Sequence, residues 1–244
     1  MDSLETELDR ARALAVDDLA DAIESIGFEC TRCGACCKGY DPADDNGESD
    51  DSGGDTAETE TDTTAREPNT ATVFPDEIRE LQDAGDYDWR DVARPMPYGL
   101  DGGDGDTDAS GETFEWALQT DACGDCTFYE ESDDGTGHCG VHDDRPLICK
   151  TYPFSVALGG TSQPMGEAVD GEGMVRAHEC EGLGRDISRD EAEELAAALK
   201  ERAIREIEEA IAVRENYESR DIDGVVVHDS EGQKRPDGTT IGSD

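Results

Sequence analysis

The longest helical pattern lies near the end of the chain. Apolar residues recur there at steps of three and four residues between Ala192 and Ile211. Ser188 followed by Glu191 has the spacing of a capping box, in which each residue satisfies a backbone amide of the first turn. The pattern predicts a long helix that begins after this serine and packs its apolar stripe into the core.

The start of the chain carries a second helical pattern. Residues 2–26 place Leu and Ile at helical spacing, Asp2 or Ser3 can cap the first turn, and Gly27 can end the helix. We therefore expect one amphipathic helix that leads directly to Cys30 and closes one side of a small core.

Two further segments have apolar residues before the middle of the chain. Residues 72–81 read T-V-F-P-D-E-I-R-E-L and predict a short helix, because Pro75 suits a first helical turn. Residues 89–98 are apolar without a clear period, and we expect them to cover the core without regular structure.

The strand patterns are few and short. Residues 114–118 alternate apolar and polar side chains, which predicts a half-buried strand. Residues 151–158 form an apolar run that fits a second strand or an extended segment. Residues 218–244 are polar, so we expect a frayed tail, with an edge strand at the three valines 225–227.

Acidic segments interrupt these elements. Residues 41–68 and 101–112 are rich in Asp, Glu, Gly, Ser and Thr and cannot bury enough surface to fold, so they are predicted to be disordered or loop insertions. Residues 161–173 are predicted to be a linker. The fold class is therefore α+β with few strands, in one small domain over residues 1–217 and a polar tail over 218–244.

The charge of the chain excludes some partners. Sixty-three acids against twenty bases give a formal charge of −43, which disfavours nucleic acid and anionic membranes. The acids are spread along the whole length and sixteen of the twenty bases are Arg, a composition that resembles the proteins of salt-loving archaea. We interpret the acidity as an adaptation to habitat and not as a functional feature.

The sequence also bears on location. No apolar run reaches the roughly 18 residues of a membrane span, and the start M-D-S-L-E-T-E lacks the basic residues of a signal peptide. We expect a cytoplasmic protein. In a reducing compartment, its nine cysteines are metal ligands or redox groups more often than disulfides.

Four of the nine cysteines lie within eight residues: Cys30, Cys33, Cys36 and Cys37. Thiolates three residues apart in a glycine-containing turn can point at one metal centre. The neighbouring Cys36 and Cys37 diverge on either a strand or a helix and do not easily serve one tetrahedral ion. They indicate two centres, or one ligand beside a redox or packing thiol.

The remaining cysteines lie far along the chain, at Cys123, Cys126, Cys139, Cys149 and Cys180. Each group alone is short of an ordinary four-thiolate site, so we expect the two groups to meet in space and the metal to hold the fold together. Loss of the metal would then unfold the protein. The C-G-D-C unit at residues 123–126 could instead be a dithiol redox pair, but no βαβ pattern surrounds it.

Other residues near the cysteines are candidates for supporting roles. Four of the few bases lie beside or between the cysteines, where they lower thiol pKa values: Arg32, Lys38, Arg145 and Lys150. His138 and His178 stand close to Cys139 and Cys180 and could be nitrogen ligands or hydrogen-bond donors, although surface or capping roles fit them better. His142 and His228 have no such neighbour.

Five motifs occur in the order of a known family: F-E-C-T-R-C-G-A-C-C-K-G at 28–39, V-F-P-D-E-I at 73–78, C-T-F-Y at 126–129, H-C-G-V-H-D-D-R-P-L-I-C-K-T-Y-P-F at 138–154 and C-E-G-L-G at 180–184. Together they resemble the YkgJ family of CxxCxxCC cysteine-cluster proteins, described as a zinc- or iron-chelating domain. The resemblance covers residues 28–184 with the acidic insertions looped out.

The resemblance implies eight metal ligands: Cys30, Cys33, Cys36, Cys37, Cys126, Cys139, Cys149 and Cys180. Cys123 lies outside the pattern. Eight thiols suit two four-thiolate sites, or one iron–sulfur cluster with spare thiols. The cofactor is then an iron–sulfur cluster or zinc, and the even spacing of the first three cysteines favours iron–sulfur.

Three functions are compatible with such a centre. The first is a metal-binding protein with a structural or electron-transfer role. The second follows from a further resemblance of the family to flagellin lysine N-methylases, which implies a cluster-dependent protein lysine N-methyltransferase, although no methyl-donor site is recognisable in this shorter chain. The third is metal delivery or thiol sensing. The expected partners are the metal ion or cluster and a protein substrate or redox partner.

Overall fold

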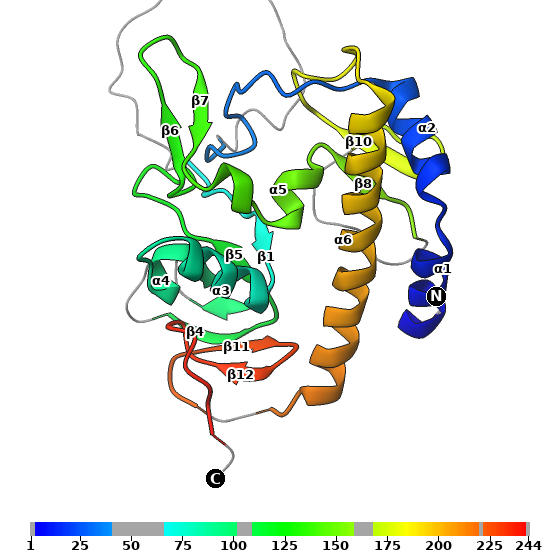
Figure 1. The fold of residues 1–244 in the computed structure, drawn as a ribbon. Helices are drawn as coiled ribbons and strands as arrows, with labels where there is room; N and C mark the ends of the chain where they lie inside the picture. Colours follow the sequence, from blue (N-terminus) through cyan, green and yellow to red (C-terminus); the bar gives the residue numbers. More distant parts are fainter. Residues whose placement is uncertain (1–2, 41–65, 102–108, 159–167, 220–221, 243–244) are drawn as a thin grey trace, which may run out of the picture.

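The long helix α6 (Arg189–Asn216) runs through the middle of the molecule (Figure 1). The computed structural model describes residues 3–40, 66–101, 109–158, 168–219 and 222–242. Helices and several small sheets are mixed, which agrees with the predicted α+β class. Most of the two predicted acidic insertions and of the predicted linker falls at 41–65, 102–108 and 159–167, outside the described residues.

Helix α6 begins where the capping box places it. The Ser188 hydroxyl accepts a hydrogen bond from the Glu191 amide (3.3 Å), and the Glu191 carboxylate accepts one from the Ser188 amide (3.1 Å). Its buried stripe includes Ala192, Leu199 and Ile207, as the periodicity predicts. None of the helices in the described part of the chain combines the length and the apolar character that a membrane crossing needs.

The predicted single N-terminal helix is wrong in one respect, because the segment forms two helices. Helix α1 covers Leu4–Ala13 and helix α2 covers Val16–Ile26, and extended backbone at Leu14 and Ala15 separates them. Both residues are tolerated in a helix, so their propensity does not cause the break. Both helices contact α6, and we attribute the break to this packing.

The buried apolar side chains of α1, α2, α6, β8 and β10 form what we call the first cluster. Strand β8 (Phe154–Val156) and strand β9 (Ala168–Asp170) pair antiparallel with strand β10 (Val175–His178) between them. Strand β8 confirms the predicted apolar strand, whereas β9 lies in the segment predicted to be a linker. Among its described residues, the first cluster contains no cysteine.

A second cluster lies on the other side of α6 and is built on a three-stranded antiparallel sheet (Figure 1). Strand β5 (Trp116–Leu118) is central, between β1 (Thr72–Val73) and β2 (Ala93–Pro95). All three residues of β5 are buried, so the prediction of a half-buried strand is wrong on this point, and Phe114 lies outside the strand and is 47% exposed.

Two helices of the second cluster lie between β1 and β2 in sequence, and a third follows β5. Helix α3 (Pro75–Ala84) begins at the predicted proline, and the Glu77 carboxylate caps it by accepting a hydrogen bond from the Phe74 amide (3.0 Å). The four-residue helix α4 (Trp89–Val92) and strand β2 occupy the segment that was expected to be irregular. The hairpin of β6 (Tyr129–Glu131) and β7 (Gly137–Cys139), the 3-10 turn η1 (His142–Asp144) and helix α5 (Leu147–Thr151) follow.

The end of the chain is integrated into a four-stranded sheet. Strand β11 (Val225–Asp229) lies between β12 (Gly232–Lys234), to which it is antiparallel, and β4 (Ser110–Thr113), to which it is parallel. Strand β3 (Leu100–Asp101) pairs with β4 at the other edge. This result corrects the prediction of an edge strand in a frayed tail, because β11 is an inner strand and four of its five residues are buried.

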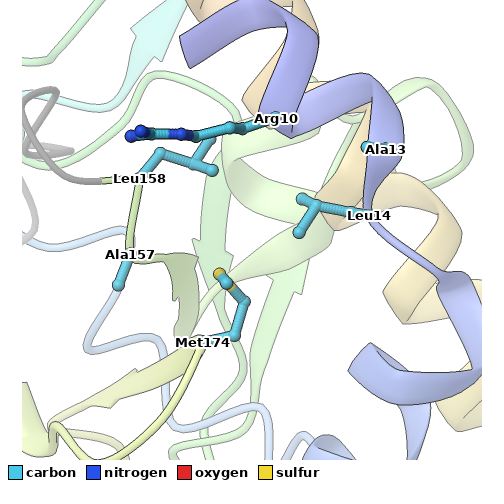
Figure 2. Close-up of a pocket in the computed structure, with 6 residues that line it drawn as sticks. All are labelled: Arg10, Ala13, Leu14, Ala157, Leu158 and Met174. Atoms are coloured by element: carbon cyan, nitrogen blue, oxygen red, sulfur yellow. The ribbon is translucent and has the colours of Figure 1, made fainter. Parts of the chain in front are cut away.

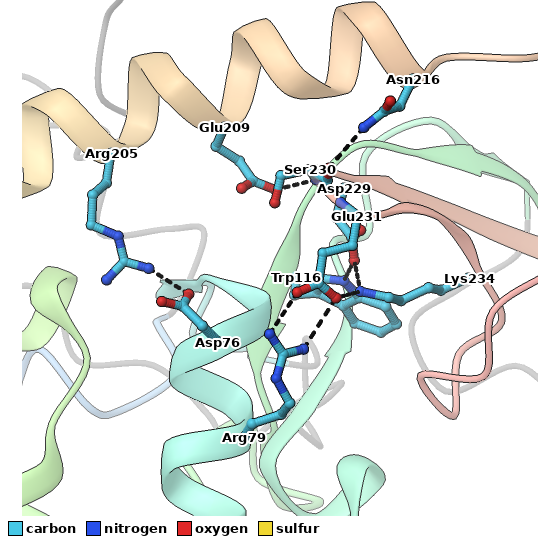
Figure 3. A network of polar contacts seen from close by, with 10 residues as sticks. All are labelled: Asp76, Arg79, Trp116, Arg205, Glu209, Asn216, Asp229, Ser230, Glu231 and Lys234. Carbon is cyan, nitrogen blue, oxygen red and sulfur yellow. Dashed lines mark hydrogen bonds and ion pairs between the residues drawn. The ribbon is translucent and has the colours of Figure 1, made fainter.

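Charged side chains fasten the β11–β12 turn to the rest of the molecule (Figure 3). The buried carboxylate of Asp229 accepts hydrogen bonds from the Trp116 indole (2.8 Å) and from Lys234 (2.7 Å). Arg79 of α3 donates two hydrogen bonds to Glu231 (2.5 and 3.1 Å). The turn therefore fastens the end of the chain to β5 and to α3, each of which precedes it by more than 100 residues in sequence.

Glu231 gives a pH-dependent prediction. The guanidinium of Arg79 and then the ammonium of Lys234 lower its pKa to about 2, against the opposing effect of partial burial. Because the folded-state pKa lies below the ordinary value of 4.5, these contacts stabilise the protein above that pH and lose their effect as the pH falls toward 2. The side chain is 40% exposed, so Glu231→Gln should cost less than about 1 kcal/mol.

This prediction is checked by denaturant unfolding of both proteins from pH 3 to pH 7. The difference in unfolding free energy between the wild type and Glu231→Gln should have its largest value near pH 7 and should shrink below pH 4.5. A difference that grows toward low pH would contradict it.

A shallow apolar pocket opens where the end of α1 meets the strands of the first cluster (Figure 2). It is lined by Arg10, Ala13, Leu14, Ala157, Leu158 and Met174. None of these six residues is a cysteine, so the pocket does not belong to the predicted metal site.

Candidate metal centre

The cysteine loop leaves α2 along the segment that carries Cys180. Phe28 and Leu183 form an isolated antiparallel bridge, and the Glu29 amide donates a hydrogen bond to the Gly182 carbonyl (3.0 Å). The ring of Phe28 packs edge-on against the ring of Phe154, with 5.7 Å between the ring centroids, and this contact anchors the crossing on the first cluster. The first and last cysteines of the pattern are thereby held side by side across 150 residues.

The middle of the loop is fixed on the β6–β7 hairpin. The Arg32 carbonyl accepts a hydrogen bond from the Gly137 amide (2.7 Å), and the Gly34 carbonyl accepts one from the Cys37 amide (2.8 Å), which closes a tight turn. Gly34 has φ of +77° and lies under the ring of Tyr129, so close that a Cβ atom there would be 2.2 Å from the tyrosine hydroxyl. Only glycine fits this position.

The end of the loop meets the C-G-D-C turn. The Cys37 carbonyl accepts a hydrogen bond from the Cys126 amide (2.7 Å), and the Cys36 carbonyl accepts one from the Asn69 side chain (3.0 Å). The Asp125 carboxylate holds the loop from the same side by accepting from the Gly39 amide (2.8 Å). The turn thus places Cys126 directly beside the pair of adjacent cysteines.

Cys139 and Cys149 reach the loop from the hairpin and from α5. Cys139 ends β7 opposite Tyr129, and Cys149 lies in the single turn of α5. The buried carboxylate of Glu77 fixes α5, because it accepts a hydrogen bond from the Leu147 amide (2.9 Å) while it caps α3. Burial raises the pKa of Glu77, although both backbone hydrogen bonds oppose the shift.

The ends of the first acidic insertion are tied together outside the loop. Tyr40 and Glu67 form an antiparallel bridge with hydrogen bonds of 2.9 and 2.8 Å between their amides and carbonyls. The described chain before the insertion therefore meets the described chain after it at this bridge.

All nine cysteines are free thiols. Cys126 is buried; Cys30, Cys36 and Cys123 are exposed, and the others are intermediate. The Sγ atoms of Cys36 and Cys37 are 3.8 Å apart. No group of three or more His, Cys, Asp or Glu side chains in the described ranges converges closely enough to hold a metal ion as the side chains stand.

The pKa values show which thiols lie near one another. Burial, with smaller contributions from Cys139 and Cys36, raises the pKa of Cys126 to about 11. Burial also raises the pKa of Cys149, with added repulsion from Cys126, Cys36 and Cys139. The pKa of Cys180 is raised by burial and then by Cys33, Cys36 and Cys30. Hydrogen bonding between Cys36 and Cys37 is the largest cause of the raised pKa of Cys36.

Of the four basic residues expected to lower thiol pKa values, Arg145 does so in the structure. Its charge lowers the pKa values of Cys36, Cys139 and Cys149 against the opposing effect of burial. Lys38 instead bonds Glu131 and lies 5.4 Å from the centre of the Tyr129 ring. The structure shows no equivalent effect for Arg32 or Lys150 among the described contacts.

Tyr152 lies near several of the thiols. Burial raises the pKa of its hydroxyl, and Cys180, Cys36 and Cys33 add to the shift. The hydroxyl donates a hydrogen bond to the Glu179 carbonyl. Of the two histidines considered, His178 is buried and its Nε2 bonds the Ser155 hydroxyl at 2.8 Å, whereas His138 is exposed on the hairpin.

Three supporting residues were not predicted from the sequence. Each of them holds a segment that carries a cysteine. Asn69 bonds the carbonyl of Cys36, Glu77 bonds the first turn of α5, and the ring of Tyr129 lies against Gly34 in the cysteine loop. Glu77 and Tyr129 lie inside the recognised motifs V-F-P-D-E-I and C-T-F-Y, which is the one signal that could have drawn attention to them.

Gly34→Ala tests the contact of the loop with Tyr129. The substitution should lower the unfolding free energy by about 2–3 kcal/mol, because a side chain at this φ is strained and the added methyl group displaces the tyrosine ring. It should also lower the metal content of the purified protein. Gly135→Ala is the matched control, since Gly135 has φ of +80° with no atom within 4 Å of its added Cβ. Equal losses in both variants would show that the ring contact contributes nothing.

The donor set fits a metal that prefers sulfur. Thiolates select zinc, copper(I) and iron–sulfur clusters, whereas magnesium and calcium require oxygen ligands. Residues 29–181 match the sequence model of a protein family, CxxCxxCC, described as a "putative zinc- or iron-chelating domain". This range is more than half of the 244 residues and contains all nine cysteines. No curated protein and no solved structure matches the chain.

Proposed function

Because the chain belongs to the CxxCxxCC family over residues 29–181, we propose that it binds a metal through eight thiols: Cys30, Cys33, Cys36, Cys37, Cys126, Cys139, Cys149 and Cys180. The observation that supports this ligand set most is the hydrogen bond from the Cys126 amide to the Cys37 carbonyl (2.7 Å), which joins the two groups of cysteines. Cys123 is exposed and stays outside the set.

The finer proposal is an iron–sulfur centre with a structural or electron-transfer role. Three cysteines spaced evenly by two residues begin like a ferredoxin cluster run, and the fourth ligand would come from a distant segment. Arg145 would balance the negative charge of the thiolates, as it already favours their ionisation. Phe128 and Val141, both buried beside Cys126, would restrict water at the deeper thiols.

The first experiment is metal and acid-labile sulfide analysis with a visible absorption spectrum. The protein is purified without oxygen in concentrated salt, and Cys123→Ser is the control. Iron together with sulfide and a broad visible absorption band would support the iron–sulfur cluster. Colourless protein that contains zinc would support metal binding but would show that the metal is zinc and not an iron–sulfur cluster. A folded protein that binds neither metal would refute the proposal.

A further inference from the structure

Four of the proposed ligands share the second hydrophobic cluster, and we call them the inner thiols: Cys37, Cys126, Cys139 and Cys149. Cys126 is one of the buried members of this cluster, and the other three pack against it. The Cys126 amide donates a hydrogen bond to the Cys37 carbonyl (2.7 Å), and the Gly140 amide donates one to the Phe128 carbonyl (2.8 Å), so the segments of Cys37, Cys126 and Cys139 are held together by the backbone.

We call the other four the outer thiols: Cys30 and Cys180 at the crossing of the loop with the Cys180 segment, Cys33 in the middle of the loop and Cys36 at its end. Cys30 and Cys36 are exposed, and Cys33 and Cys180 are intermediate. The Glu29 amide bonds the Gly182 carbonyl (3.0 Å), and the Cys180 sulfur accepts from the Gly182 amide (3.4 Å), which keeps this segment beside Cys30.

Cys36 and Cys37 stand where the two groups meet, with their sulfur atoms 3.8 Å apart. This separation would also suit two ligands of one tetrahedral ion, since zinc–sulfur bonds of about 2.3 Å span roughly that distance. The count of ligands favours a division. The inner thiols already number four without Cys36, and the three remaining outer thiols need Cys36 to complete a four-thiolate set.

We propose that the eight thiols form two adjacent metal centres, an inner one that is enclosed by apolar side chains and an outer one that faces solvent and exchanges its metal. The proposal rests on the proposed function, because it divides the same ligands. The inner centre serves the fold and the outer centre is the one that a redox partner or metal acceptor can reach. Since neither set converges as the side chains stand, binding requires rotation of the cysteine side chains.

The test uses the full chain, purified without oxygen in concentrated salt and supplied with Co²⁺, whose thiolate absorption reports binding. The amount bound is measured by titration, and the release is followed after addition of a chelator. Cys180→Ser removes an outer ligand, Cys139→Ser removes an inner ligand, and Cys123→Ser is the control outside both sets. Circular dichroism checks that each variant is folded.

The wild type and Cys123→Ser should bind two ions, one released about tenfold or more faster than the other, because an apolar shell slows access to the inner ion. Cys180→Ser should lose the fast ion and keep the slow one. Cys139→Ser should lose the slow ion, and if this variant does not fold, the wild type and Cys180→Ser still decide the question.

Two results would overturn the inference and leave the proposed function intact: one bound ion per chain that both Cys180→Ser and Cys139→Ser abolish, or two ions released at the same rate. Absence of any bound Co²⁺, together with absence of iron and zinc in the purified protein, would instead refute the proposed function itself.

Discussion

Removal of the metal is expected to unfold the part of the protein around the second cluster and to leave the helices of the first cluster in place. A structural metal contributes on the order of 10 kcal/mol, which is comparable with the whole stability of an ordinary domain. The central sheet of the second cluster has strands of only two or three residues, so a metal would supply a large share of the stability there. Its cysteines come from four separate segments, and without metal their thiols contribute only packing.

The first cluster does not depend on the thiols in the same way. Its described members include no cysteine, and α6 packs along both α1 and α2 (Figure 1). The sequence alone suggested that the whole chain would unfold without metal. The separation into two clusters now predicts a partial loss of structure.

Hydrogen exchange with and without a chelator is the measurement that checks this prediction. Amides of β5 and β7 should lose protection, whereas those in the middle of α2 and α6 should keep most of it. Addition of metal should restore the lost protection, and Cys123→Ser should behave like the wild type. Equal loss of protection in α6 and β5 would contradict the prediction, and so would no loss at all.

The elements that could be predicted from the sequence are those that local interactions determine. The start of α6 follows from Ser188 and Glu191 and the start of α3 from Pro75, because each cap involves residues within one turn. The break between α1 and α2 and the inner position of β11 were not predictable in this way. Strand β11 pairs with β4 across more than 100 residues, and no local pattern records such a contact.

The candidate site likewise has residues that the local sequence reveals and residues that depend on distant contacts. Cysteine chemistry and the family motifs nominate the thiols, and the structure brings their segments to one loop. The residues that fix those segments were missed, because Asn69 and Glu77 act on partners 33 and 70 residues away. The side chain of Asn69 is also a common one and lies outside the recognised motifs, whereas Glu77 lies inside V-F-P-D-E-I.

Arg202→Met is expected to give a large loss of stability. Arg202 lies on α6 with a side chain that is 1% exposed. Its guanidinium bonds the Thr151 hydroxyl (3.0 Å) at the end of α5 and the Phe154 carbonyl (3.3 Å) on β8, and it pairs with Glu206 (2.7 Å). One charged group therefore connects α6 to the segment that follows Cys149.

The substitution should cost about 3 kcal/mol, because removal of one partner from a buried ion pair leaves the other groups without compensation. Methionine keeps an unbranched stem and a similar helix propensity, so the loss does not come from a weaker helix but from the missing donors and from the space that the guanidinium filled. The cost lies at the lower end of the range for buried pairs, since Glu206 is 24% exposed and can turn toward water.

Arg214→Met is the matched control, because Arg214 lies on the same helix and pairs with Glu5 at 2.6 Å but is 49% exposed. This variant should lose less than about 1 kcal/mol. Denaturant unfolding of the metal-loaded proteins in concentrated salt gives both values under one condition. If Arg202→Met loses no more than Arg214→Met, the buried guanidinium does not hold α5 and β8 against α6.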